Sequence, residues 1–283
     1  MEKVFYTKEI TSESLLKIYH RLGKTPHGRV AVKLHFGEVG NPYYIRPDIV
    51  RPLVEEVGGT FVETNVYYGP RAKTETHLEV ARDHGFDYAP VDILDADGSV
   101  MVPVVGGNRF KEAKLGAGID RYDFLISIAH FKGHMMAGFG GTFKNMAIGI
   151  ASRDGKLLVH HGQGGSGEFL GGKEFLENVA EYSKAAIDYY GKENLVFINV
   201  LNNMSIDCDC DGHPHAPEVE DIGILASNDP VALDRASVDL VRKAPGSRHL
   251  VERIDEKQGM HLLDYLEQMG GVGSQEYELE CID

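Results

Sequence analysis

Three consecutive stretches decide the fold: RVAVKLHF at 29–36, RPDIVRPLVEEVGG at 46–59 and TFVETNVYY at 60–68. The outer two are β-branched runs of strand length, whereas the middle one has the length and spacing of a helix and ends in two glycines. A strand, a helix and a second strand in this order are typical of a βαβ unit, in which the strands are parallel. The sequence therefore predicts an α/β fold with a mostly parallel or mixed sheet flanked by helices.

The remaining sequence continues this alternation. Asp229 and Pro230 are a typical N-cap and first-turn residue, so a helix is expected to begin there. The expected elements are a helix at 73–86, strands at 90–96, 99–107 and 122–131, a helix at 173–191, strands at 194–206 and 222–227, a helix at 229–244, a helical tail at 247–270 and a last strand at 275–282. The pattern leaves open a single domain over residues 1–283 or two α/β lobes that meet near residues 120–160.

Composition excludes several classes of protein. The chain has 29 Lys and Arg against 43 Asp and Glu, a formal charge of -14, whereas binding a nucleic acid backbone requires a basic face. No stretch approaches the roughly 20 apolar residues of a membrane helix, and the start lacks the pattern of a signal peptide. Three cysteines provide no disulfide framework. We expect a cytoplasmic protein with no nucleic acid or membrane partner.

Histidines, lysines and glycines gather in HFKGHMMAGFGGTFKN, from His130 to Asn145, directly after a predicted buried strand. Ligands of open α/β sheets bind at the carboxyl ends of strands. A helix that begins at Thr142 would add free backbone N–H groups, which favour an anion together with lysines. The alternative is a tight glycine turn with solvated lysines. The predicted ligand-binding residues are Lys132, Gly140, Gly141, Thr142, Lys144 and Asn145.

The second polar segment is DCDCDGHPH, from Asp207 to His215. Two thiolates and two imidazoles satisfy a tetrahedral zinc site or an iron site, although a Cys-x-Cys pair holds one ion only where the backbone bends. The aspartates are expected to raise the pKa of the thiols. The alternative is a polar loop with two reduced cysteines. The predicted metal ligands, for zinc or iron, are Cys208, Cys210, His213 and His215.

A third segment, VKLHFGEVGNPYYIRP at 32–47, places Lys33 and His35 on one face of a predicted strand. A lysine beside a histidine at a strand end is a plausible substrate contact, and an edge strand with solvated polar residues is the alternative. His160 and His161 are expected at the surface without a role.

KLHFGE at 33–38, the segment from His130 to Arg153, DCDCDG at 207–212 and DIGILASNDPVALDRASVDLV at 221–241 together resemble the family catalogued as "domain of unknown function 362", often described as an iron–sulfur-centre domain. The resemblance covers nearly the whole chain. Many relatives look like fusions with an inserted ferredoxin module, and in this chain the cysteine-free stretch 162–172 occupies that place. The matching motif positions are Lys33, His35, His130, Lys132, His134, Lys144, Asn145, Cys208 and Cys210.

The leading hypothesis is a metal- or redox-associated enzyme acting on a small anionic molecule. Lys132, Lys144 and the backbone of Gly140 and Gly141 would hold the anion, and Cys208 and Cys210 would bind a metal or act as thiols. The expected catalytic residues are Lys33, His35, His130 and His134. Three cysteines cannot supply a four-thiolate iron–sulfur cluster, but the fused relatives imply reductive chemistry with a ferredoxin-like electron donor. The other hypotheses are a non-catalytic metal- or metabolite-binding module, an electron-transfer scaffold, and a purely structural role for both segments.

Overall fold

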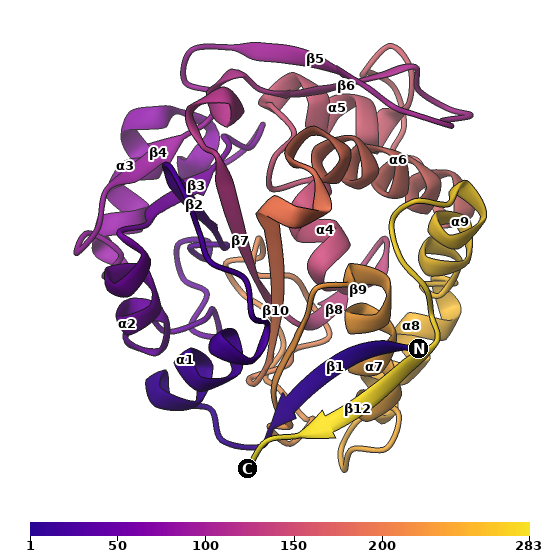
Figure 1. Cartoon of the computed structure of the whole chain (residues 1–283). Coiled ribbons are helices and arrows are strands. Elements are labelled where there is room, and N and C mark those ends of the chain that lie inside the picture. The colour runs from indigo at the N-terminus through magenta and orange to yellow at the C-terminus, as the bar shows by residue number, and fades with distance from the viewer.

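An eight-stranded sheet runs through the computed structural model, which describes all 283 residues (Figure 1). β11 is antiparallel to both of its neighbours, and every other neighbouring pair is parallel, so the predicted mixed α/β sheet is confirmed. In spatial order the strands are β12 (Tyr277–Cys281), β1 (Glu2–Thr7), β11 (Gly223–Ser227), β10 (Leu195–Leu201), β7 (Phe124–His130), β2 (Val30–Lys33), β3 (Thr60–Glu63) and β4 (Val91–Ile93).

Helices cover both faces of this sheet and enclose two hydrophobic cores. Three helices contribute to the smaller core: α1 (Ser12–Arg21), α2 (Pro47–Val57) and α3 (Thr74–Asp83). Six contribute to the larger core: α4 (Thr142–Ala147), α5 (Arg153–His161), α6 (Gly172–Tyr190), α7 (Pro230–Val241), α8 (Arg248–Glu256) and α9 (His261–Met269). None of the helices combines the length and apolar character needed to cross a bilayer.

The central strands are buried on both faces. In β7, Phe124, Ile126 and Ile128 belong to the smaller core and Leu125 to the larger one, because successive side chains of a strand point to opposite faces. This explains why the strand is a continuous apolar run rather than an alternating one. Strands that lie before and after residues 120–160 in the sequence belong to the same sheet.

Two hairpins lie outside the main sheet: β5 (Ser99–Pro103) with β6 (Glu112–Gly116), and β8 (Lys132–His134) with β9 (Gly138–Gly140). The strand expected at 99–107 is present as β5, although it ends at Pro103. Short 3-10 turns cover η1 (Pro70–Ala72), η2 (Ala117–Arg121) and η3 (Lys192–Asn194). Asp229 caps α7 as predicted, since its side chain accepts a hydrogen bond from the Ala232 N–H.

Several predicted elements are longer than the observed ones, and two of the differences have clear causes. The helical tail at 247–270 is two helices, because Gln258 adopts a left-handed φ of 57° between α8 and α9. The strand expected at 60–68 ends at Glu63, and its neighbour β4 ends at Ile93, so residues 64–68 have left the sheet. Both β2 and β3 therefore end in a charged side chain at the carboxyl edge of the sheet.

Candidate functional site

The three polar segments meet at this carboxyl edge. Lys33, Glu63 and His130 are the last residues of β2, β3 and β7, which are neighbours in the sheet. The loop after β10 brings Asp209 to the same place, where it lies 2.8 Å from both His130 Nδ1 and Lys132 Nζ. Residues near 130 and near 210 thus lie together, at the edge where open α/β sheets bind ligands.

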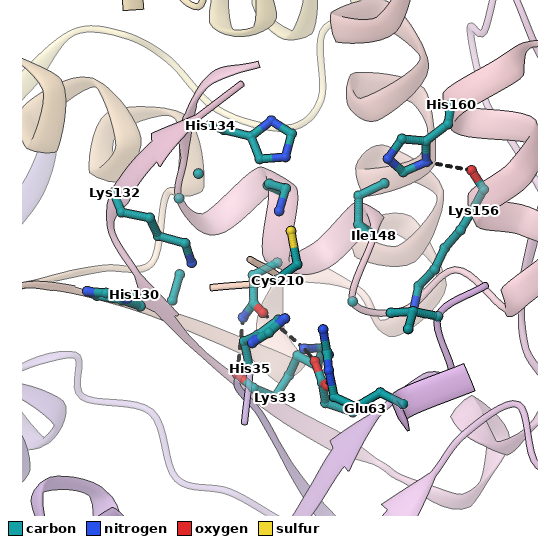
Figure 2. Close-up of a pocket in the computed structure, with 18 of the residues that line it drawn as sticks. Lys33, His35, Glu63, His130, Lys132, His134, Ile148, Lys156, His160 and Cys210 are labelled. Carbon is teal, nitrogen blue, oxygen red and sulfur yellow. Dashed lines mark hydrogen bonds and ion pairs between the residues drawn. The ribbon is translucent and has the colours of Figure 1, made fainter. Parts of the chain in front are cut away.

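A small cavity of about 70 Å³ lies between these segments, and we call it the inner pocket. Its walls carry five cationic side chains and one carboxylate, that of Glu63, in a chain whose net charge is -14. The cations are Lys33, Arg71, Lys132, Lys144 and Lys156. Figure 2 shows Lys132 and Lys156 entering from opposite sides, with Cys210 between His134 and His35.

Glu63 is the centre of a buried ion-pair network. Its carboxylate lies 3.0 Å from Lys33 Nζ, 3.3 Å from Arg71 Nη1 and 3.0 Å from His77 Nε2. Burial alone would raise the pKa of Glu63, but the charge on Lys33 and the other cations holds it well below its ordinary value. Arg71 also pairs with Glu38 at 3.0 Å. These contacts fix the floor of the inner pocket.

Asp209 organises the wall formed by β7 and β8. Its carboxylate accepts from His130 Nδ1 and from Lys132 Nζ, and the other ring nitrogen of His130 lies 2.6 Å from the Asn202 carbonyl oxygen. Burial raises the pKa of Asp209, but the charges on His130 and Lys132 lower it below its ordinary value. Since both ring nitrogens of His130 face oxygen acceptors, the ring is engaged within the wall.

Cys208 and Cys210 lie beside Lys144 at this edge of the sheet. Lys144 Nζ lies 2.9 Å from Cys208 Sγ. A hydrogen bond from the Cys210 thiol, together with the Lys144 ammonium, holds the pKa of Cys208 well below its ordinary value despite burial. The same hydrogen bond and burial raise the pKa of Cys210. These directions, and the contact with Lys144, favour ionisation at Cys208 over ionisation at Cys210.

The expected effect of the aspartates on these thiols is wrong in direction for Cys208. The carboxylates of the segment are directed elsewhere, because Asp209 pairs with His130 and Lys132, and Asp207 lies 2.6 Å from His215 Nδ1. The cation that stabilises the thiolate is Lys144.

Three histidines around the inner pocket are neutral. Burial lowers the pKa of His134 and of His160 to about 4, and holds that of His35 well below its ordinary value. His35 Nδ1 accepts from the Gly37 N–H at 2.9 Å, and His134 Nδ1 accepts from the Ala137 N–H at 3.0 Å. In a neutral ring the other nitrogen then carries the proton, so each Nε2 is a donor at the pocket wall.

Two cationic groups of the inner pocket can still bind a ligand. Arg71 is 1% exposed, and its Nη2 has no hydrogen-bond partner although it lines the inner pocket. Lys156 Nζ donates to the Thr64 and Asn65 carbonyl oxygens, at 2.8 and 2.7 Å, and pairs with no carboxylate. Burial lowers the pKa of Lys156 to about 7. A buried guanidinium nitrogen without a hydrogen-bond partner destabilises the fold unless a ligand supplies the acceptor.

The predicted helix does begin at Thr142, but its first N–H groups are already occupied. The Asp234 carboxylate of α7 accepts from the Thr142 N–H at 2.8 Å and from the Phe143 N–H at 3.2 Å. A Cβ on Gly141 would lie 2.5 Å from an Asp234 oxygen, so glycine is required for this close approach. The expectation of free N–H groups for an external anion is therefore wrong, because an internal carboxylate takes them.

The other predicted ligand-binding residues divide between the inner pocket and its supports. Gly140, Gly141, Lys132, Lys144 and Asn145 line the pocket, whereas Thr142 does not and donates its hydroxyl to Asn199 Oδ1 at 3.0 Å. Asn145 accepts from Lys33 Nζ and donates to the Ser127 hydroxyl, and so ties α4 to β2 and β7.

The predicted metal ligands are not assembled. No group of three or more His, Cys, Asp and Glu side chains is arranged to hold a metal ion. His213 and His215 belong to an exposed loop, and His215 pairs with Asp207 rather than facing the cysteines. Lys144 Nζ lies where a cation beside Cys208 would sit, so the residues present do not fit a four-ligand zinc or iron site at this pair.

Several site residues were not predicted from the sequence. They are Glu63, Arg71, Lys156, His160 and Asp209. The expectation that His160 lies at the surface is wrong: it is buried against Tyr67 and Phe175, lines the inner pocket, and has its Nδ1 2.7 Å from the Lys156 carbonyl oxygen. A signal existed for Glu63 alone, as a charged residue inside a predicted strand.

Fold and site together define an α/β protein with a cation-rich pocket and a thiol pair at the carboxyl edge of its sheet. The chain belongs to the family described as Domain of unknown function (DUF362), whose model matches residues 30–239. No curated protein sequence matches it.

Two solved structures resemble the chain distantly. One is the lactate racemase apoprotein from Thermoanaerobacterium thermosaccharolyticum, with 13% identity and a TM-score of 0.49, covering 84% of this chain and 56% of that one. The other is a protein from Thermotoga maritima, with 14% identity and a TM-score of 0.44, covering 91% of this chain and 58% of that one. The chain thus spans somewhat more than half the length of either protein.

Proposed function

We propose that this protein is a thiol-dependent enzyme that acts on a small anionic molecule. The observation that carries the proposal is the position of Lys144, which lines the cationic inner pocket and lies 2.9 Å from the Cys208 sulfur. An anion bound in the pocket would contact the same lysine that stabilises a thiolate at Cys208, and a thiolate is the reactive form of cysteine.

The charge balance of the inner pocket supports an anion as the ligand. Five cationic side chains line the pocket, and their partners are the carboxylates of Glu63, Glu38 and Asp209 and the Cys208 thiolate. One positive charge, that of Lys156, has no anionic partner. A carboxylate or phosphate group would pair with the charge of Lys156 and accept a hydrogen bond from the free Nη2 of Arg71.

Each side chain has a distinct role in this proposal. Arg71, Lys156 and the Nε2–H of His35 bind the anionic group. Cys208 is the nucleophile, and Cys210, whose thiol donates to it, supplies or takes the proton of the pair. His130, predicted to be catalytic, is a positioning residue here, because it holds Asp209 in place.

Two alternatives place different chemistry at the cysteine pair. In the redox form of the proposal, which rests on the resemblance to ferredoxin fusions, the Cys208 thiolate and the Cys210 thiol pass two electrons and one proton to a reducible anionic substrate and form a disulfide. A ferredoxin-like donor then returns the thiolate and thiol in two one-electron steps with uptake of one proton. A zinc or iron ion is the other alternative, but we derive no step through it because the donor set does not fit. A non-catalytic anion-binding module would need the same pocket without a reactive thiol.

The first prediction concerns acetate, which stays ionised between pH 6 and 9. We expect it to bind in the inner pocket at pH 6 with a millimolar or tighter Kd, measured by calorimetry. Affinity should fall about tenfold per pH unit above pH 7, because Lys156 then loses its proton and the bound anion favours the charged form. The Lys156→Met variant should bind at least tenfold more weakly at pH 6 and show little pH dependence.

Lys173→Met is the matched control, since Lys173 is an exposed lysine in the first turn of α6. It should bind acetate like the wild type at every pH. If acetate does not bind, or if it binds to the Lys156→Met variant as tightly as to the wild type, the inner pocket is not an anion site and the proposal fails.

A further inference from the structure

The inner pocket opens into a second, larger cavity. This outer groove has a volume of about 940 Å³, against about 70 Å³ for the inner pocket. The two share Tyr67, Tyr68, His134, His160 and Cys210 as lining residues. A molecule whose anionic group fills the inner pocket can therefore extend the rest of its structure past the thiols and into the groove.

The outer groove gathers several exposed apolar side chains. Ten large hydrophobic side chains of the chain are exposed, and four of them line this groove: Val39, Tyr68, Met135 and Phe169. Met135 is 65% exposed and Phe169 is 58% exposed. Grouped apolar side chains on a surface mark a binding site, whereas scattered ones need no explanation.

An aromatic wall connects the two cavities. Tyr67 packs edge-on against His160 with ring centroids 5.7 Å apart, and His160 packs edge-on against Phe169 at 6.1 Å. Tyr67 and His160 line both cavities, and Phe169 lines only the groove. Figure 2 shows His160 at the rim of the pocket, beside Lys156. The passage from pocket to groove is thus walled by uncharged rings.

The charged residues of the groove disfavour a second anion. Glu38, Asp207, Asp211 and Glu256 line it, against Arg253 and Lys257. An anionic group that reached this region would face an excess of carboxylates, in contrast to the cationic inner pocket.

We propose that the substrate is an organic monoacid whose single anionic group enters the inner pocket and whose apolar body lies in the outer groove. This inference rests on the proposed function and adds the substrate class. It places the atoms next to the anionic group beside Cys210, which lines both cavities, and the atoms that follow beside Cys208, which lines the groove.

The test is a series of straight-chain carboxylates, from acetate to octanoate, with binding measured by calorimetry at pH 6 below the micelle concentration. Once the chain leaves the inner pocket, each added methylene should tighten binding about three- to fourfold. Suberate, which has the length of octanoate and a second carboxylate, should bind at least tenfold more weakly than octanoate.

The variants Phe169→Ala and Met135→Ala should each reduce, by severalfold, the increase in affinity from acetate to octanoate. Val105→Ala is the control, since Val105 is an equally exposed apolar residue outside the groove, and it should keep the full gain. If acetate binds but octanoate binds no better, or if neither groove variant changes the gain, the inference is overturned and the proposed function stands. If no carboxylate binds, the proposed function itself fails.

Discussion

Replacing Glu63 by glutamine lowers the free energy of unfolding by about 3–5 kcal/mol, the cost of breaking a buried ion pair by removing one partner. The glutamine keeps the shape of the side chain, but Lys33, Arg71 and His77 lose the carboxylate that all three contact. Urea unfolding followed by circular dichroism measures the change. We expect no other single polar substitution in the chain to cost more.

The matched control is Glu79→Gln, an exposed position on α3, which should change the free energy of unfolding by less than about 0.5 kcal/mol.

The pH dependence of the stabilisation by Glu63 follows from its lowered pKa. Its contribution is fully present above the unfolded pKa of about 4.3 and is lost as the pH falls through the lower folded pKa. An unfolding free energy of the Glu63 variant equal to that of the control would mean that the network does not support the pocket.

The Lys144→Gln variant should react with iodoacetamide at Cys208 roughly 10- to 20-fold more slowly than the wild type at pH 6. Without the ammonium, the pKa of Cys208 rises toward the ordinary thiol range, although the contact with Cys210 remains, so a smaller fraction is thiolate at pH 6. Part of this loss is offset, because a more basic thiolate is a better nucleophile. Peptide mass spectrometry assigns the rate to Cys208.

Lys144→Arg keeps a positive charge beside the sulfur and should restore most of the rate. Cys281 is exposed and serves as an internal reference within the same protein, since its rate should not depend on Lys144. Equal rates at Cys208 in the glutamine, arginine and wild-type proteins would show that Lys144 does not control the thiolate.

Much of the fold could be predicted from the sequence because its signals are local. The β-branched runs at 29–36 and 122–131, the cap at Asp229 and the glycines that end α2 each act over a few residues. Gln258 carries no such signal, since a left-handed glutamine is held by its surroundings. The helical tail was therefore predicted as continuous.

The site could be predicted only where lysine, histidine or cysteine side chains lie near the ends of predicted strands. Lys33 and His130 were found because they lie near the ends of predicted strands, and Cys208 and Cys210 because they follow one. Lys156 was missed because a lysine on a helix usually faces water, and only the packing of α5 against residues 64 and 65 buries it. Asp234 was missed because it caps a helix 92 residues earlier in the chain, a contact without any local signature.

The central claim is that a small anion binds beside a reactive thiolate, and one competition of reagents tests both parts. Iodoacetate and iodoacetamide alkylate thiolates alike, but only iodoacetate is an anion. With Cys281→Ser protein at pH 6.5, we measure both rates at the Cys208–Cys210 pair. The account predicts that iodoacetate reacts at least tenfold faster, and that Lys156→Met and Arg71→Lys abolish this preference. Faster reaction with iodoacetamide, as for a free cysteine in water, would contradict it.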